Sequence, residues 1–206
     1  MTIVELREKI PNDIFSALEL NGYLGEYRQK RAKIASLLKR GEIVQIRRGL
    51  YTFAASLRRE PLNVGVLANR IYGPSYVSED FALSYYGMIP EATAMVTSVA
   101  MGRSRTFANE FGVFSYRYCR SGAYAVGVNL VGEGKQRFLV ATQEKALFDK
   151  ALNDKRFDGN DPESYLADDL RIDLTALSGL DKDVLTALAP FMLGRLKKLY
   201  LYLEAI

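Results

Sequence analysis

The stretch from residue 27 to residue 53, YRQKRAKIASLLKRGEIVQIRRGLYTF, decides the fold of the first part of this chain. At 100° per residue, its first half separates an apolar side from a polar side, which predicts an amphipathic helix from about Glu26 to Arg40. The apolar side holds Tyr27, Ile34, Ala35, Leu37 and Leu38, and the polar side holds Arg28, Gln29, Ala32, Lys33, Ser36, Lys39 and Arg40.

A β-hairpin is expected directly after this helix. Gly41 has the place of the glycine that ends a helix, and residues 42 to 53 change to the two-residue period of strands. Arg48-Gly49 is expected to form a two-residue turn in which the glycine has a positive φ. The expected pairs are Arg47 with Leu50, Ile46 with Tyr51, Gln45 with Thr52 and Val44 with Phe53, which places Val44, Ile46, Tyr51 and Phe53 on the face that covers the helices.

Positive charge is concentrated in the same part of the chain. Residues 28 to 59 contain ten lysines and arginines and one acid, Glu42, whereas the remainder contains 18 basic and 23 acidic residues. Because this surplus lies on one helix side and one hairpin tip, it favours a polyanionic partner bound through its phosphates. A solvated helix face is the alternative interpretation.

The expected partner is double-stranded DNA. Small Ala32 and Ser36 lie among long basic and amide side chains, a mixture that suits insertion into a groove. The residues expected to contact DNA are Arg28, Gln29, Lys30, Lys33, Ser36 and Arg40 on the helix and Arg47 and Arg48 at the hairpin tip.

The residues before this stretch are expected to complete a small helical domain. Asp13 is expected to cap a helix from Ile14 to Leu20, which Asn21-Gly22 then ends. Two helices followed by a hairpin are typical of a winged helix-turn-helix, which we expect at residues 1–58.

A second, larger α/β domain is expected at residues 62–206, after the polar, proline-containing stretch from Ala54 to Asn63. Strands bracketed by helices give the chain as a whole an expected α+β (mixed α/β) class. The expected strands are Met95–Ala100, Arg105–Phe107, Val113–Tyr118, Tyr124–Leu130 and Arg137–Ala141. The expected helices are Val64–Tyr72, Glu79–Tyr86 capped by Ser78, Gln143–Leu152 capped by Thr142, one from Asp161-Pro162 to about Leu170, and a tail from Asp181 that Pro190 interrupts.

Composition narrows the possible chemistry. The 206 residues include no histidine and one cysteine, Cys119, so no Ser-His or Cys-His nucleophile, internal disulfide or Cys/His zinc site is expected. No Walker-type or Gly-x-Gly-x-x-Gly motif is present, and Gly132 to Lys135 is expected to be a hairpin turn. We expect no cofactor, no metal and no enzymatic activity. Without an apolar run of about 18 residues, we expect a cytoplasmic protein with no membrane partner.

The polar residues of the second domain allow two interpretations. Lys145 and Asp149 are four residues apart on one expected helix, a spacing that usually gives a modest surface ion pair. Alternatively they join Ser78 and Glu79, near Ser84 and Tyr85, in a recognition surface for RNA or protein. Two further sets are noted: Arg103, Arg105, Arg117 and Arg120, expected to serve solubility, and Asp158, Asp161, Asp168, Asp169 and Asp173, the acid-rich stretch that a magnesium-dependent enzyme would need. In the tail, Leu193, Leu196, Leu199, Tyr200 and Leu203 form an apolar stripe expected to dock on its own domain, with self-association as the alternative.

Several blocks of the sequence resemble the AbiEi-type antitoxins of bacterial abortive-infection operons. In the first domain they are Gly22-Tyr23, LLKRGEI at residues 37–43 and IRRGLY at residues 46–51. In the second domain they are YGPSYVS at 72–78, ALSYYGMIPE at 82–91, FGVFSY at 111–116 and EKALFD at 144–149. The resemblance covers about Asn12 to Lys150.

The resemblance implies a bifunctional protein of a type IV toxin–antitoxin system. Its winged helix would repress its own operon by binding inverted repeats, and its second domain would counteract a nucleotidyltransferase-like toxin, without a stable complex between the two. Two rival interpretations remain: a nucleic-acid-processing enzyme whose winged helix binds the substrate, and an interaction module whose winged helix binds protein.

Overall fold

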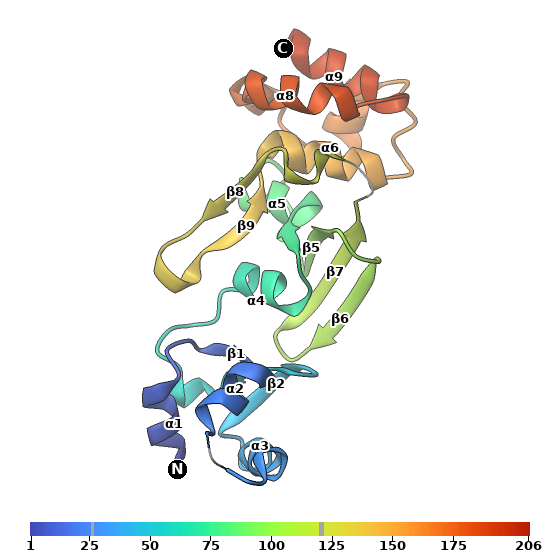
Figure 1. The fold of residues 1–206 in the computed structure, drawn as a ribbon. Coiled ribbons are helices and arrows are strands. Elements are labelled where there is room, and N and C mark those ends of the chain that lie inside the picture. Colours follow the sequence, from blue (N-terminus) through green and yellow to red (C-terminus); the bar gives the residue numbers. More distant parts are fainter. Residues whose placement is uncertain (26, 120–121) are drawn as a thin grey trace.

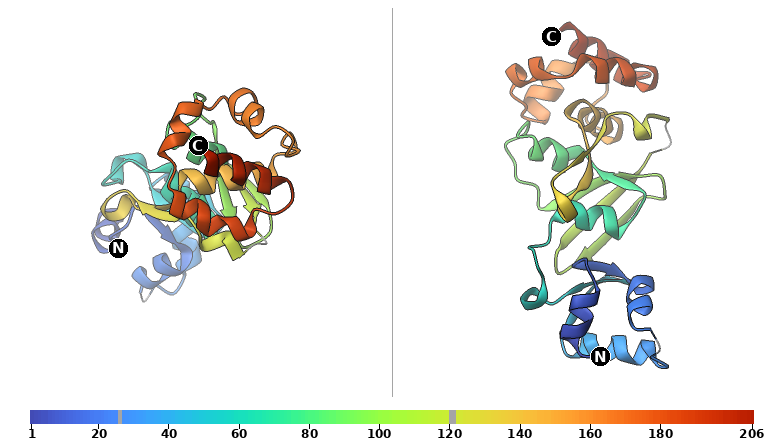
Figure 2. Two further views of the ribbon diagram at one scale, coloured as in Figure 1. Left: turned by 90° about the horizontal axis from the view of Figure 1, so that it is seen from above. Right: turned by 60° about the vertical axis from the view of Figure 1, so that its left-hand side comes forward.

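The computed structural model describes residues 1–25, 27–119 and 122–206. It has a mixed α+β fold, as expected (Figure 1). A small unit of helices and a three-stranded sheet lies at one end of an elongated molecule, a six-stranded mixed sheet lies in the middle, and the C-terminal helices lie at the other end (Figures 1 and 2). None of the helices in the described ranges is long and apolar enough to cross a membrane.

The first elements differ from the expectation. A helix α1 (Ile3–Lys9), which was not expected, begins with a capping box formed by Thr2 and Glu5. Residues Ile14–Ser16 form strand β1 instead of starting a helix, because they pair with a later strand. Helix α2 (Ala17–Tyr23) therefore begins after Ser16, whose hydroxyl accepts from the Glu19 amide at 3.1 Å. Asp13 is thus not a helix cap, and Asn21-Gly22 lies inside α2.

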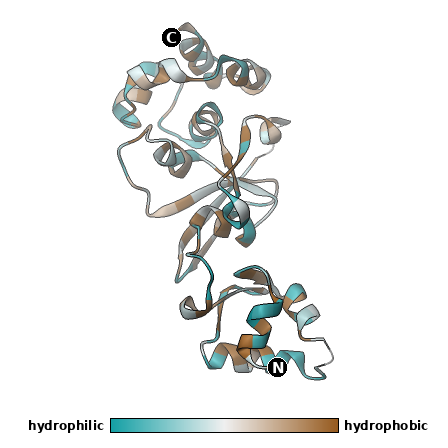
Figure 3. Ribbon diagram, turned by 90° about the vertical axis from the view of Figure 1, so that its left-hand side faces the viewer, coloured by the Kyte–Doolittle hydropathy of each residue, from teal (hydrophilic) through white to brown (hydrophobic). Residues whose placement is uncertain are grey.

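Helix α3 (Lys30–Lys39) is the expected basic helix, but it begins later than predicted. Glu26, the expected first residue, lies outside the described residues. Gly41 has a φ of 65°, as a glycine that ends a helix requires. Only Ile34 and Leu37 of its expected apolar side are buried, whereas Ala35 and Tyr27 are exposed. The helices of this unit carry both hydrophilic and hydrophobic residues (Figure 3).

The hairpin consists of β2 (Ile43–Arg47) and β3 (Leu50–Phe53), and Gly49 has the expected positive φ of 80°. The expected pair of Arg47 and Leu50 is present. The other expected pairs are wrong by one residue, because an irregularity between Gln45 and Arg47 shifts the register. The observed pairs are Gln45 with Tyr51, Val44 with Thr52 and Ile43 with Phe53.

The shifted register gives this sheet, ordered β1-β3-β2, two buried faces. Phe15, Ile43 and Phe53 belong to the apolar core of the N-terminal helices. Ile14, Ile46 and Leu50 belong instead to the core of the second domain. The hairpin therefore seals the helices with one face and joins the two domains with the other.

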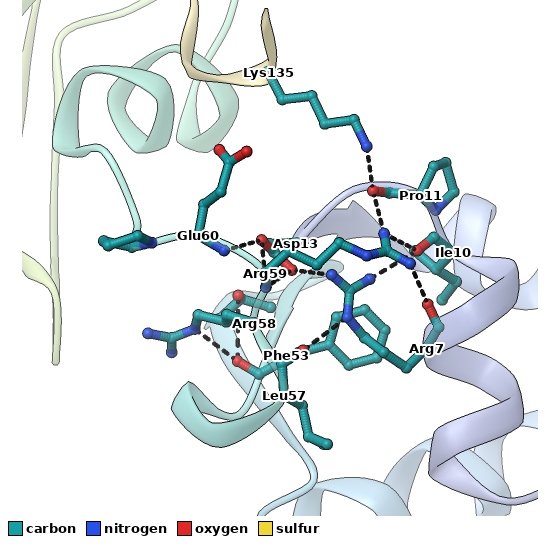
Figure 4. Close-up of polar contacts among 12 residues, drawn as sticks. Arg7, Ile10, Pro11, Asp13, Phe53, Leu57, Arg58, Arg59, Glu60 and Lys135 are labelled. Atoms are coloured by element: carbon teal, nitrogen blue, oxygen red, sulfur yellow. Dashed lines mark hydrogen bonds and ion pairs between the residues drawn. The ribbon is translucent and has the colours of Figure 1, made fainter.

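The linker between the domains is held by a polar cluster around Asp13 (Figure 4). The Asp13 carboxylate accepts from Arg7 Nη2 at 2.6 Å and from the amides of Arg59 and Glu60 at 3.2 Å. The Arg59 guanidinium donates to the Pro11 carbonyl at 2.7 Å. From the second domain, Lys135 donates to the same carbonyl at 2.5 Å. The expected linker is thus fixed at both ends.

The sheet of the second domain has the order β6-β7-β5-β4-β9-β8. Its strands are β4 (Ser75–Val77), β5 (Met95–Ala100), β6 (Arg105–Asn109), β7 (Gly112–Tyr118), β8 (Val128–Val131) and β9 (Phe138–Ala141). Strand β4 was not expected, and β8 begins four residues later than predicted. Gly132 to Lys135 lies in the connection of β8 and β9, as expected.

The helices of the second domain pack on this sheet and on one another. They are α4 (Val64–Ile71), α5 (Glu79–Tyr85), α6 (Gln143–Asn153), α7 (Pro162–Ser164), α8 (Lys182–Leu188) and α9 (Arg195–Ala205). Thr142, Asp161 and Asp181 are N-caps of α6, α7 and α8. In the tail stripe, Leu196, Leu199 and Leu203 are buried in their own domain, as expected, whereas Leu193 is 71% exposed.

Candidate nucleic-acid interface

Helix α3 lies at the end of the molecule that is farthest from the second domain (Figures 1 and 2). Its inner side packs Ile34 and Leu37 into the small core. Its outer side is open and carries the exposed row Arg31, Ala32, Ala35 and Lys39, which exposed Arg28 extends from two residues before the first helical residue. We call this row the α3 face. The short side chains of its two alanines lie between longer cationic side chains.

The expected contact residues divide into two groups. Arg28 and Gln29 are exposed and directly precede Lys30, the first residue of the helix. Lys30 and Lys33 are half-buried, and their amines donate to the carbonyls of Asn21 at 2.9 Å and Met1 at 3.0 Å. These two lysines hold α3 against α2 and against the residue at the chain start, so their amines are already occupied.

Two more of the residues expected to contact DNA are not fully available to a ligand. Ser36 is half-buried, and Arg40 forms an ion pair with Glu42 at 2.8 Å. Arg31 was not among the expected contacts although it lies on the α3 face. A helical wheel centred on Ala32 and Ala35, instead of on Lys33 and Ser36, would have included it.

The hairpin tip is exposed but lies beside the second domain. The side chains of Arg47 and Arg48 are both exposed, as expected. However, Asn109 in the second domain donates to the Ile46 carbonyl at 3.1 Å. Burial raises the pKa of Tyr116, and the nearby Arg47 charge opposes that rise. The tip is therefore a fixed element at the domain junction, and Arg48 is its freer cation.

The positive surplus of residues 28 to 59 is only partly available to a ligand. Arg58 donates to the Phe53 carbonyl at 2.9 Å, and Arg59 belongs to the linker cluster. Among the lysines and arginines of residues 28 to 59, those whose side chains form no hydrogen bond or ion pair with the described residues are Arg28, Arg31, Lys39 and Arg48. Three of these four cations lie on the α3 face, so the available charge is concentrated there.

The four polar residues expected to form a recognition surface in the second domain are buried. Lys145 and Asp149 are paired at 2.8 Å with side chains 0% and 1% exposed, so the expected surface ion pair is wrong. The hydroxyls of Tyr76 and Ser78 donate to the same carboxylate at 2.9 and 2.7 Å. Burial raises the pKa of Asp149, and the Lys145 charge opposes the rise.

Ser78 and Glu79 are also buried, with 0% and 4% of their surface exposed. Because the Ser78 hydroxyl is used by Asp149, it does not cap α5 as expected. Ser84 is half-buried and Tyr85 is exposed, where its ring packs on Tyr86 and Phe138. The recognition surface expected from Ser78, Glu79, Lys145 and Asp149 is therefore an internal network.

The remaining sets have local roles. Arg103, Arg105 and Arg117 are exposed, and Arg120 lies outside the described residues. Asp161 and Asp173 cap helical turns, and Asp158 and Asp168 bind Asn160 and Ser164. In residues 1–25, 27–119 and 122–206, no group of three or more histidines, cysteines or acids is placed to hold a metal ion.

Comparison with protein-family models gives no matching family, and comparison with curated proteins gives no significant relative.

Proposed function

We propose that this protein is a cytoplasmic, sequence-specific DNA-binding autorepressor that also acts as an antitoxin. The observation that supports DNA binding is the α3 face, which is open, basic and located at a free end of the molecule. The resemblance to AbiEi-type antitoxins supports the inverted repeats of the operon as target and a nucleotidyltransferase-like toxin as the antagonised protein.

The chemistry of the α3 face suits the major groove of DNA. A groove about 12 Å wide admits a helix, and Ala32 and Ala35 let the helix backbone approach the base edges closely. Arg28 and Arg31 are long enough to bind guanine or phosphate, and Gln29 is suited to adenine. Lys39 and Arg48 would neutralise phosphates on either side, which fixes position without reading sequence.

Inverted repeats require two copies of the α3 face. In dimeric helix-turn-helix proteins the two half-sites are about 34–36 Å apart, so two chains would have to associate or bind cooperatively. The second domain is the larger part of the chain and would bring the two copies together.

DNA binding is tested by measuring the affinity for the operon promoter over a series of salt concentrations. Arg28→Ala/Arg31→Ala should weaken binding to all sequences and reduce the salt slope by about 2, because about one counterion is released per phosphate contact. Arg103→Ala/Lys197→Ala removes two exposed cations from the second domain and is the matched control. Equal affinities for the two double variants would contradict the proposal.

Sequence reading and antitoxin action need separate tests. Gln29→Ala should change the preference among operator variants, whereas Arg48→Ala should weaken binding to all of them. For the antitoxin, the neighbouring operon gene is expressed alone and together with this chain, and growth is measured. Growth arrest that this chain does not relieve would contradict the antitoxin role and leave the DNA-binding role intact.

A further inference from the structure

A second site lies in the larger domain, away from the α3 face. A cavity of about 270 Å³ opens between the start of α5, strands β5 and β7 and the end of α6. An adjoining cavity of about 380 Å³ shares Asp80, Met95, Thr97 and Arg156 with it. Small-molecule sites usually measure about 300–1,000 Å³, so the two parts together have the size of such a site.

Glu79 is the unusual residue of this cavity. It is 4% exposed and lines the wall of the cavity. Its Oε1 accepts from Asn153 Nδ2 at 2.8 Å, whereas Oε2 has no hydrogen bond within the described part of the chain. Its φ of 52° is rarely adopted by residues other than glycine. Its neighbour Ser78 is fixed by the hydrogen bond to Asp149, which maintains this conformation.

Most other charges around the cavity already have partners. Lys150 pairs with Asp80 at 2.8 Å, and Arg156 pairs with Asp154 at 2.6 Å. Arg117 and Lys155 have no ion pair or hydrogen bond among the described residues, although both line the same cavity as Glu79, and of the two only Arg117 has a guanidinium that can bind a carboxylate through two parallel hydrogen bonds. A buried carboxyl group and an exposed guanidinium therefore lie across one small space without binding each other.

The adjoining part of the cavity is mainly apolar on one wall, where Ile89, Met95 and Leu170 are found. A ligand that occupies both parts needs a cationic donor for Glu79, an anionic acceptor for Arg117 and an apolar group for this wall. The four cations that line the smaller cavity are offset by Glu79, Asp80 and Asp154, so the site lacks the large surplus of positive charge that binds a polyanion such as nucleic acid.

We propose that this two-part cavity binds a free α-amino acid with an apolar side chain. Its ammonium group pairs with Glu79, its carboxylate pairs with Arg117, and its side chain packs against Ile89, Met95 and Leu170. This proposal is independent of DNA binding, since no residue of the α3 face takes part.

The protonation of Glu79 gives the site a pH dependence. Burial and the charge of Asp149 on α6 raise its pKa to about 7, while Arg117 on β7 and Lys150 on α6 oppose the rise, together with the hydrogen bond from Asn153. Asp80 lies next to Glu79 and is paired with Lys150. A bound ammonium group stabilises the ionised carboxylate, so affinity should fall as the pH drops below about 7.

The test is isothermal titration calorimetry of the full chain with L-leucine, L-methionine and L-phenylalanine. At least one should bind with a dissociation constant between about 1 µM and 1 mM. N-acetyl-L-leucine lacks the ammonium group, L-leucinamide lacks the carboxylate and glycine lacks the side chain, so each should bind at least about tenfold more weakly, a change of 1.4 kcal/mol. Inorganic phosphate should not bind.

Variants connect the binding to the two charged residues. Glu79→Gln and Arg117→Ala should each weaken binding about tenfold or more, whereas the control Lys197→Ala should not change it. Arg117 is exposed, so its variant tests the site even if Glu79→Gln does not fold. Absence of binding by all three amino acids at about 10 mM, equal binding of N-acetyl-L-leucine, or unchanged affinity of Arg117→Ala would each overturn the proposal.

Discussion

Helices α3 and α6 both carry charged residues at helical spacing, but their charges have opposite fates. The cations Arg31 and Lys39 on α3 and Arg28 just before it are exposed, because only one side of this helix packs on the small core. On α6 the pair of Lys145 and Asp149 is fully buried, because this helix packs against three other helices, α5, α8 and α9. The same local pattern is therefore a solvent-facing surface in one place and an internal network in the other.

The largest effect is expected from breaking the α6 pair. Lys145→Met leaves the Asp149 carboxylate buried without its cation and should lower the free energy of unfolding by about 3–5 kcal/mol. Lys145→Met/Asp149→Leu should recover much of this loss, since no buried charge is left. Urea denaturation measures both. A matched change on the α3 face, Arg31→Met, should leave stability within about 0.5 kcal/mol.

A second prediction concerns the buried carboxyl group beside that pair. The pKa of Glu79 is raised to about 7 from its ordinary value of 4.5, so the folded state binds a proton that the unfolded state releases. The stability contributed by this proton is present below pH 4.5 and is lost as the pH rises through 7, by up to about 3 kcal/mol at 1.36 kcal/mol per pKa unit.

Glu79→Gln should remove the loss of stability that accompanies a rise of the pH through 7. The free energy of unfolding, measured between pH 4.5 and 8, should fall less steeply in the variant than in the wild type. Parallel curves would show that Glu79 does not titrate in this range.

The linker cluster gives an intermediate effect. Asp13→Ala leaves Arg7 and the amides of Arg59 and Glu60 without their acceptor, which should cost about 1–3 kcal/mol. Limited proteolysis should also cut faster within residues 54–63. Glu8→Ala, which removes an exposed acid on α1, is the control and should change neither quantity. If Asp13→Ala resembled it, the linker would not depend on this carboxylate.

The smallest effect is expected in DNA binding, where two nearby cations of α3, Arg31 and Lys33, should behave differently. Arg31→Ala should weaken DNA binding and reduce the salt slope by about 1, since its side chain is free. Lys33→Ala should leave the slope nearly unchanged, because its amine already binds the Met1 carbonyl. Anisotropy titrations at several salt concentrations measure both. A larger change of slope for Lys33→Ala than for Arg31→Ala would contradict the assigned α3 face.

Local sequence signals predicted much of the fold. Gly41 and Gly49 ended a helix and formed a turn as expected, and Thr142, Asp161 and Asp181 capped helices. Short strands were missed, however. Strands β1 and β4 have three residues each, too few to show a period, and exist because neighbouring strands pair with them.

Long-range packing explains the errors at the candidate site. The register shift at Ile46 follows from a second apolar surface that this residue contacts, and no signal within the hairpin reports that surface. Likewise, the Lys33 amine is occupied because the chain start lies beside it, whereas the Arg31 side chain has no hydrogen-bond or ion-pair partner in residues 1–25, 27–119 and 122–206. A helical wheel gives the spacing of side chains but not the direction in which the core lies.

By itself, the sequence determined the α+β class, the basic helix and hairpin near its start and the glycines and caps that delimit them, since these depend on backbone preferences and on residues close in the chain. Only the tertiary structure decided which charges are free and which are buried, because exposure depends on what packs on the other sides of a helix. For that reason Lys145 and Asp149 of α6 lie in the interior of the second domain, while the arginines of the α3 face remain available to a partner.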